Sequence, residues 1–205
     1  MNSMKYFIDF EFIEGFHKPL FGKRRHFIDL ISVGVVSEDN RNLHLISSEY
    51  RYKDADPWVR RNVIDNLYLS EVHGDYRNWI EAHNFHRSGF GVTNDNICAE
   101  LLEFFQCYRD QLFWRAPEGI EVYGYYAGYD WVLLCSLFGR MIDLPKGFPM
   151  YCRDLKQMMD ERGVSSDHPD CPKQKNEHNA LGDAMWNREV YKWLKSFARL
   201  KEGEV

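Results

Sequence analysis

Runs of apolar and aromatic residues predict five strands. The first, Lys5–Phe12, contains four aromatic residues and Ile8 but no Gly or Pro, which is typical of a buried strand. Further runs follow, and only the short turn 37–40 separates the second from the third. Such a turn predicts an antiparallel hairpin, so the sheet should begin with a three-strand meander. The later runs are Phe27–Val36, Asn42–Tyr50, Glu121–Gly128 and Met150–Leu155.

Helical periodicity lies between and after these runs. Asp56-Pro57 predicts an N-cap followed by the first helical residue, and Thr93 lies at the start of a second helix. No internal repeat, low-complexity tract or linker divides the chain, so we expect one α/β domain over residues 1–205. The later helices expected are Ile97–Tyr108, Trp131–Phe138, one that follows the strand ending at Leu155 and ends at Arg162-Gly163, and Asn179–Leu200.

Two polar stretches interrupt this pattern. Residues 13–26 contain two glycines, a proline and the basic triplet Lys23-Arg24-Arg25, which predicts a loop. A solvated turn and a phosphate-contacting loop are both compatible with the triplet. In segment 70–91, His83 and His86 have a spacing that could suggest zinc, but no cysteine is close by and a solvated loop is the simpler interpretation.

Composition narrows the function classes. A net charge of −5 and a pI of about 5.9 argue against a protein that coats duplex nucleic acid through a large basic surface. No apolar run approaches the length of a membrane span and no signal peptide is visible, so we expect neither membrane insertion nor secretion. The cysteines form no C-x-x-C pair, which predicts reduced thiols in a cytoplasmic protein. They are Cys98, Cys107, Cys135, Cys152 and Cys171.

The first strand carries two carboxylates, Asp9 and Glu11. Side chains two residues apart on a strand point to the same face, so these carboxylates should lie close together. Like charges repel, and burial beside Phe10 and Phe12 adds a desolvation cost, so a cation is expected between them. Oxygen ligands favour Mg²⁺ or Mn²⁺. An Asp-x-Glu pattern alone is weak evidence for a catalytic metal site, so further carboxylates elsewhere in the chain are needed to support it.

Three further residues lie where a strand meets a helix or a helix begins. Asp130 follows the fourth apolar run, where an N-cap aspartate and a functional carboxylate are equally compatible. His178 and Asp183 lie at the start of the last helix. Each alone suits a surface histidine or a capping aspartate, but together with Asp9 and Glu11 they indicate one site at the sheet edge.

In this order, Asp9-x-Glu11, Tyr129-Asp130 and His178-x-Ala180-Leu181-x-Asp183 resemble the three motifs of the DEDDh 3′–5′ exonucleases. The resemblance covers nearly the whole chain. Softer positions resemble one branch, the RNase AS-like exoribonucleases, whose founding members prefer polyadenylate. Tyr126 departs from the wider superfamily, where many relatives have Asn, and loop 15–26 is longer than a minimal member needs. The softer positions are Tyr6–Ile13, Ile31–Val36, Asp56–Val63 and Tyr125–Asp130.

The resemblance implies a ribonuclease H-like three-layer fold, with a mixed five-stranded sheet flanked by helices. Strands 1–3 would form the antiparallel meander, and strands 4 and 5 would run parallel. Asp9, Glu11, Asp130 and Asp183 would hold two divalent cations, Mg²⁺ or Mn²⁺, that activate water and stabilise the departing 3′ oxygen. His178 would accept the proton of that water, because imidazole titrates near neutral pH.

The implied reaction releases nucleoside 5′-monophosphates from a 3′ end. We expect single-stranded RNA with a 3′ adenine, bound mainly by short-range stacking because the protein is acidic. A DNA exonuclease would use the same catalytic residues, whereas a non-catalytic scaffold would have lost a metal ligand, and none is lost. The branch also implies a homodimer. A core role for Phe12 is equally compatible with the sequence. Lys173, Lys175 and Arg153 are candidate phosphate contacts, although loop lysines are usually only solvated. The expected substrate contacts are Glu11, Phe12, Ile13, Tyr126, Tyr129 and Lys175.

Overall fold

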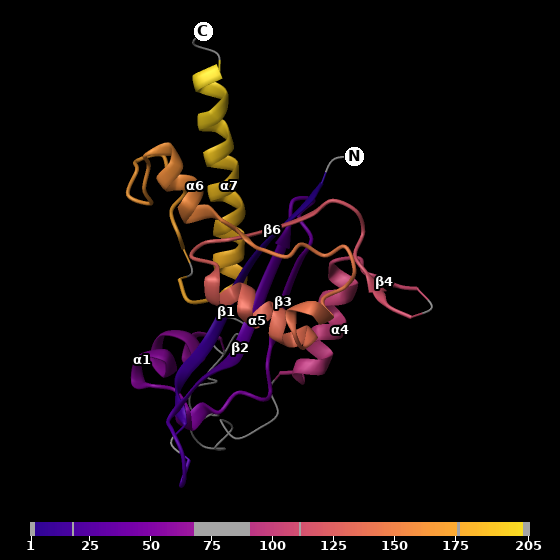
Figure 1. The fold of residues 1–205 in the computed structure, drawn as a ribbon. Helices are drawn as coiled ribbons and strands as arrows, with labels where there is room; N and C mark the ends of the chain where they lie inside the picture. The colour runs from indigo at the N-terminus through magenta and orange to yellow at the C-terminus, as the bar shows by residue number, and fades with distance from the viewer. Residues whose placement is uncertain (1–2, 18, 68–90, 111, 176, 203–205) are drawn as a thin grey trace, which may run out of the picture.

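The computed structural model describes residues 3–17, 19–67, 91–110, 112–175 and 177–202. Five strands form one sheet in the order β3-β2-β1-β6-β7 (Figure 1). β1 pairs antiparallel with β2 and β2 with β3, whereas β1–β6 and β6–β7 are parallel. The predicted meander followed by two parallel strands is therefore confirmed. The strands are β1 Met4–His17, β2 Arg25–Ser37, β3 Asn42–Ile46, β6 Ile120–Gly124 and β7 Arg153–Asp154.

The helices begin largely where capping residues predict. The Asp56 carboxylate accepts hydrogen bonds from the backbone N–H groups of Trp58 and Val59, at 2.7 and 2.9 Å. Thr93 accepts from Asn96 N–H at 3.3 Å, so both predicted caps are confirmed. The helices are α1 Pro57–Val59, continued by the π-helical turn η2 Arg60–Ile64, then α4 Asn94–Phe104, α5 Gly128–Phe138, α6 Leu155–Arg162 and α7 Ala180–Glu202.

Helices cover both faces of the sheet, which confirms the three-layer architecture. Side chains of alternate residues of β1 point to opposite faces of the sheet, as the two-residue period of a strand requires. Ile8 and Phe10 belong to the core shared with α4 and α5. Phe7 packs with residues of α6 and α7, and Ile13 with the residues around α1 and η2.

The loop predicted over residues 13–26 is largely strand instead. β1 continues to His17 and β2 begins at Arg25, so the two strands form a long hairpin. The prediction of a loop rested partly on the glycines, but Gly15 is a strand residue. A Cβ at position 15 would lie 2.9 Å from the Phe27 ring on the opposite strand, so the glycine makes room for an aromatic partner.

Several other predicted boundaries are wrong. Helix α4 ends at Phe104, and Gln106 then adopts a left-handed φ of 59°, so Tyr108 is not on its buried face. Tyr108 is 55% exposed and pairs in a small hairpin, β4 Tyr108–Arg109 with β5 Trp114–Arg115. Strand β6 stops at Gly124 and α5 starts at Gly128, which places Asp130 inside the first helical turn. β3 and β7 are also shorter than predicted.

The histidines of segment 70–91 lie outside the described residues. All five cysteines are free thiols. Within the described ranges, no helix combines the length and apolarity needed to cross a lipid bilayer.

Helix α7 approaches the sheet closely at Gly34 of β2. A Cβ at this position would overlap the backbone of Ala180 and Leu181 in the first turn of the helix. Backbone atoms cannot rotate away as a side-chain end can, so only glycine allows this approach.

Gly34→Ala should therefore lower the free energy of unfolding by about 1–3 kcal/mol or more, because it overpacks the contact between β2 and α7. Urea denaturation measures the change. Gly128→Ala is the matched control: a Cβ there meets no heavy atom within 4 Å, and it replaces a helical glycine. This control should be neutral or stabilising by about 0.4–1 kcal/mol. Equal effects of the two substitutions would contradict the steric explanation.

Candidate active site

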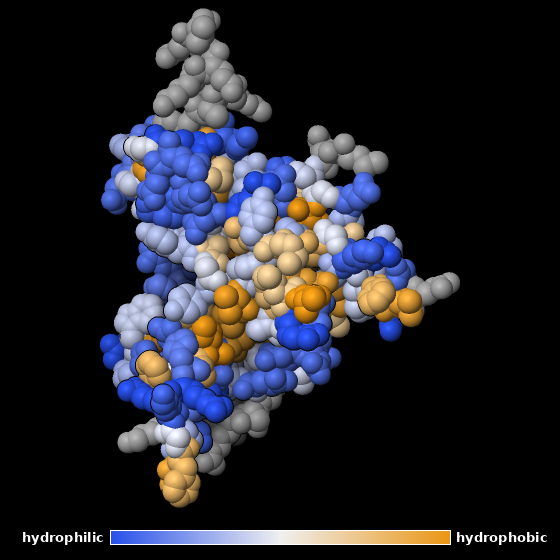
Figure 2. Space-filling view, in the orientation of Figure 1, coloured by the Kyte–Doolittle hydropathy of each residue, from blue (hydrophilic) through white to orange (hydrophobic). Residues whose placement is uncertain are grey.

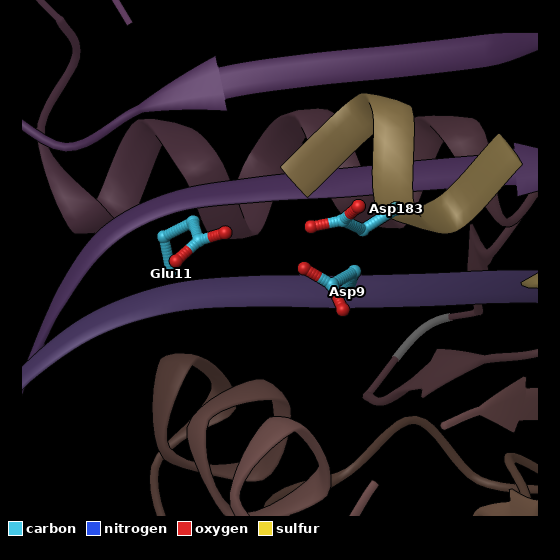
Figure 3. Close-up of side chains that lie close together, drawn as sticks. All are labelled: Asp9, Glu11 and Asp183. Atoms are coloured by element: carbon cyan, nitrogen blue, oxygen red, sulfur yellow. The ribbon is translucent and has the colours of Figure 1, made fainter. Parts of the chain in front are cut away.

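Three carboxylates converge between β1 and the start of α7. Asp9 and Glu11 leave β1 on the same face, and Asp183 meets them from the first turn of α7 (Figure 3). One carboxylate oxygen of each residue lies within 4.8 Å of the others. Gly34 is the β2 partner of Asp9, so the close approach of α7 at Gly34 is what brings Asp183 to this strand.

Asp130 completes the acidic group from another direction. β1 pairs with β6 only as far as Phe7, and beyond that point its edge is open. The Asp130 carboxylate fills the opening and accepts the Phe10 backbone N–H at 2.8 Å. Asp130 is only 7% exposed and raises the pKa of Asp9 by repulsion, although it is not one of the three mutually close carboxylates.

The Asp183 carboxylate is fixed by two hydrogen bonds from the preceding loop. The backbone N–H of His178 donates to one oxygen at 3.0 Å, and the side-chain amide of Gln174 donates to the other. Sequence analysis does not identify Gln174, because a single Gln in a polar loop carries no signal until the loop folds against the helix. Gln174 therefore orients a predicted metal ligand.

His178 has a strained backbone and a specific aromatic neighbour. Its φ is 65°, in the left-handed region that non-glycine residues rarely occupy. The imidazole ring meets the half-exposed Trp58 ring edge-on, with 4.7 Å between the centroids. Next to it, Asn179 caps the helix by accepting the Gly182 N–H at 3.0 Å. The sequence predicts Trp58 on the apolar stripe of the helix after Asp56, but no role for it in the site.

Burial and mutual repulsion favour the protonated form of the acidic group. Burial is the largest cause for each residue, and repulsion between the carboxylates adds to it. Together they raise the pKa of Glu11 to about 8 and the pKa of Asp9 well above its ordinary value. Burial raises the pKa of Asp130 to about 7, although its hydrogen bond from Phe10 N–H opposes the change. Burial also raises the pKa of Asp183.

These pKa shifts predict that, in a chelator, the protein loses stability as pH rises. Glu11 titrates near 4.5 in the unfolded chain and near 8 in the folded one, so between these values the folded state binds more protons. The stabilisation is fully present below pH 4.5 and is lost as pH rises through 8. Melting temperatures across this window should fall in chelator, and Mg²⁺ should reverse the fall at the alkaline end.

Glu11→Gln is the control for this prediction, because its neutral amide should make the fall shallower, while Asp9 and Asp130, whose pKa values are also raised, still contribute to it. Asp110 and Asp143, whose pKa is about 2, titrate below the window and do not interfere. A wild-type melting temperature that rises between pH 5 and 8 in chelator would contradict the assigned direction.

The acidic group suits a hard divalent cation. All its donors are carboxylate oxygens, which Mg²⁺ and Mn²⁺ prefer, whereas zinc favours nitrogen or sulfur. A divalent cation would also remove the repulsion that raises these pKa values. The observed donor set therefore fits the predicted metals.

The predicted substrate residues differ in how exposed their side chains are. Phe12 is half-buried beside the α4–α5 core, on the face opposite Glu11, and stacks on the Tyr129 ring with a centroid distance of 5.5 Å. Tyr129 and Tyr126 are exposed, and Tyr126 also has a left-handed φ of 53°. Ile13 is 1% exposed in the core near α1, so its side chain packs and only its backbone could meet a substrate.

The predicted phosphate contacts also differ. Lys173 and Lys175 are exposed on either side of Gln174, whose amide holds Asp183. Arg153 forms an ion pair with Glu121 at 3.3 Å and lies over the Tyr123 ring. Arg153 is therefore engaged with β6, and the structure does not bring it to the acidic group.

Named exoribonucleases resemble the chain in sequence, and a solved exonuclease resembles it in fold. Two curated proteins of Mycobacterium tuberculosis, 3′-5′ exoribonuclease Rv2179c of strain H37Rv and 3′-5′ exoribonuclease MT2234.1 of strain CDC 1551, are each 32% identical over 181 residues. Each alignment covers 88% of this chain and 87% of the relative. Among solved structures, exonuclease I is similar in fold, with a TM-score of 0.54 at 12% identity. E. coli exonuclease I in complex with a dT13 oligonucleotide gives the same values.

The chain spans only 41–43% of the length of these exonuclease I structures, while 95–98% of the chain is covered. The structural similarity therefore supports the fold. The family model described as the 3′-5′ exoribonuclease Rv2179c-like domain matches residues 4–194, almost the entire sequence. The chain belongs to the Rv2179c-like 3′-5′ exoribonuclease family.

Proposed function

We propose that this protein is a metal-dependent 3′–5′ exoribonuclease that releases nucleoside 5′-monophosphates from single-stranded RNA. One observation carries the proposal: Asp9, Glu11 and Asp183 converge, with Asp130 beside them, in a chain of an exoribonuclease family. Converging carboxylates, two of them buried and two partly buried, are costly unless cations neutralise them.

In this proposal Asp9, Glu11, Asp130 and Asp183 hold two Mg²⁺ or Mn²⁺ ions. When bound, such ions supply Lewis-acid activation of water and phosphate. His178 accepts the proton of the attacking water as general base, because it lies directly before α7 and its backbone already contacts Asp183. Gln174 keeps the Asp183 carboxylate in place.

The terminal nucleotide is held by short-range contacts. The exposed rings of Tyr126 and Tyr129, which precede Asp130 in the chain, contact the base, and Phe12 supports Tyr129 by stacking on it. Stacking favours purines because they cover more ring area, at about 1–3 kcal/mol per base. We propose adenine at the 3′ end, and selection of adenine over guanine requires hydrogen bonds to the base edge.

The direct test incubates 5′-labelled RNA and DNA strands of the same sequence with the protein and Mg²⁺ or Mn²⁺. We expect a ladder that shortens from the 3′ end, faster for RNA than for DNA and fastest for a 3′ adenine. Faster hydrolysis of DNA would replace the proposal with a DNA exonuclease. Equal rates on all four 3′ bases would remove the adenine preference, and intact strands in every lane would overturn the activity.

We also propose that the protein acts in the cytoplasm as a homodimer. The five free thiols suit a reducing compartment. Sedimentation equilibrium measures the assembly, and a mass near the 24.4 kDa of one chain at all concentrations would exclude the dimer.

A further inference from the structure

The far ends of β1 and β2 leave the rest of the sheet and continue as a two-stranded arm (Figure 1). Their ladder runs from Glu14 paired with Ile28 to His17 paired with Arg25. The neighbouring strands do not follow, because β6 pairs with β1 only as far as Phe7 and β3 pairs with β2 only from Ser32 onward. We call the described residues 14–17 and 19–28 the hairpin arm.

The hairpin arm concentrates positive charge in an acidic protein. Lys23, Arg24 and Arg25 are consecutive and exposed. Among the described residues, none of the three forms an ion pair with a carboxylate, whereas Glu14 is paired with His26 at 3.5 Å. The arm therefore presents an uncompensated cationic patch in a chain whose net charge is −5. Such a patch attracts phosphate groups.

Exposed apolar side chains accompany these cations. Phe16 is 55% exposed and Phe21 is 87% exposed, beside the still more exposed Leu20. Figure 2 shows hydrophobic residues at the tip of the arm and hydrophilic residues directly behind them. The Arg24 guanidinium lies 4.1 Å from the centre of the Phe16 ring. Aromatic rings interleaved with arginine are the means by which proteins stack bases of single strands.

The base of the arm is fixed to the body of the protein. Arg51 donates a hydrogen bond to Asp29 at 2.8 Å and lies 4.4 Å over the Phe27 ring. Phe27 in turn stacks on His17, with 4.3 Å between the ring centroids. These contacts give the arm a defined direction relative to the sheet.

That direction is set by the strand that carries the acidic group. β1 holds Asp9 and Glu11 and then continues into the arm. At about 3.4 Å per residue, Phe16 lies about 17 Å beyond Glu11. An RNA strand whose 3′ phosphate lies at the carboxylates therefore has its preceding nucleotides within reach of the arm.

We propose that the hairpin arm binds single-stranded RNA upstream of the terminal nucleotide. Lys23, Arg24 and Arg25 contact phosphates, and Phe16 and Phe21 stack on bases. This inference rests on the proposed function, because it extends the substrate path of the same site. A second copy of the chain is the other occupant that an exposed apolar tip could receive, but the adjacent cations and the continuity with the acidic group favour RNA.

The test combines Lys23→Gln, Arg24→Gln and Arg25→Gln in one variant. The matched control makes the same charge change elsewhere, at the exposed Arg109, Lys146 and Lys195. Fluorescence anisotropy in chelator measures binding of RNA of about 20 nucleotides at several salt concentrations. Loss of three phosphate contacts should make the slope of log affinity against log salt less negative by about 2. Affinity should fall at least about tenfold for the arm variant and stay unchanged for the control.

Activity provides the second measurement. The arm variant should lose kcat/KM on the long RNA to a similar extent and retain it on a dinucleotide, which is too short to reach the arm. Phe16→Ala should weaken binding of the long RNA about fivefold to more than a hundredfold without changing the salt slope, because stacking is not ionic.

The outcomes separate the arm from the proposed function. If the wild-type protein binds RNA through the arm in chelator but hydrolyses no RNA with Mg²⁺ or Mn²⁺, the proposed role of the arm stands and the proposed activity is wrong. Equal losses on the dinucleotide and the long RNA would overturn an upstream role, as would an arm variant that matches the control. Unchanged RNA binding with a dimer that dissociates in the arm variant would reassign the arm to contact between copies.

Discussion

Asp9→Asn should lower turnover by more than about 10³-fold without unfolding the protein. Asp9 belongs to the three mutually close carboxylates and is surrounded by the other acidic residues. Loss of a metal ligand removes several kcal/mol of transition-state stabilisation, which corresponds to this factor in rate. Single-turnover hydrolysis of labelled RNA measures it. Asp183→Asn should behave the same way, and excess chelator should reproduce the loss in the wild-type protein.

Stability distinguishes this explanation from simple misfolding. Asn is neutral and nearly isosteric with Asp, so it removes both the repulsion and the burial cost at position 9. In chelator, the Asp9→Asn variant should melt at or above the wild-type temperature, and Mg²⁺ should raise its melting temperature less. Asp160→Asn on α6 removes an exposed ion pair with Lys156 and should leave turnover unchanged. Near-normal turnover of Asp9→Asn would refute the metal assignment.

His178→Ala should lower kcat by about 10²- to 10⁴-fold with little change in KM, the range expected when a general base is lost. His178 has a left-handed φ of 65°, where Ala is strained and Asn is tolerated. His178→Asn should therefore show the same loss of kcat with better retention of stability. If the Asn variant recovered most of the activity, the side chain at 178 would not act as the base.

Metal affinity separates a base from a ligand. Calorimetric titration with Mn²⁺ should give the same affinity for wild type and for His178→Asn, because the proposal assigns the metals to the four carboxylates. A strong loss of affinity would make His178 a ligand. His168→Ala is the matched control: its ring lies against Trp193, which is ten residues beyond Asp183 on α7, or about 15 Å along the helix. This control should keep full turnover.

The strand period and helix-capping preferences predicted those features that depend only on residues close together in the sequence. The two-residue period of a strand places Asp9 and Glu11 on one face, and the structure brings their carboxylates together. The caps at Asp56 and Thr93 are equally local and were also predicted correctly. Asp183 required a longer argument, because its approach to β1 depends on the contact at Gly34, which a single sequence does not reveal.

The features that could not be predicted depend on tertiary contacts. Gly15 lies in a stretch whose composition is typical of a loop. In the structure it is a strand residue, and the absence of a side chain leaves room for the Phe27 ring on the opposite strand. Gln174 gains its role only when the loop before α7 folds back on Asp183. Phe12 and Tyr129 come from a strand and a helix more than a hundred positions apart, so their stacking has no local signal.

The docking of α7 on β1 also determines when the site can exist. Asp183 is 174 positions after Asp9, so at translation rates of about 5–20 residues per second it is made about 9–35 s later. Until then Asp9 and Glu11 lack the third of the three mutually close carboxylates. Under the proposed function, a nascent chain therefore cannot attack the RNA around it before α7 emerges and folds back on β1.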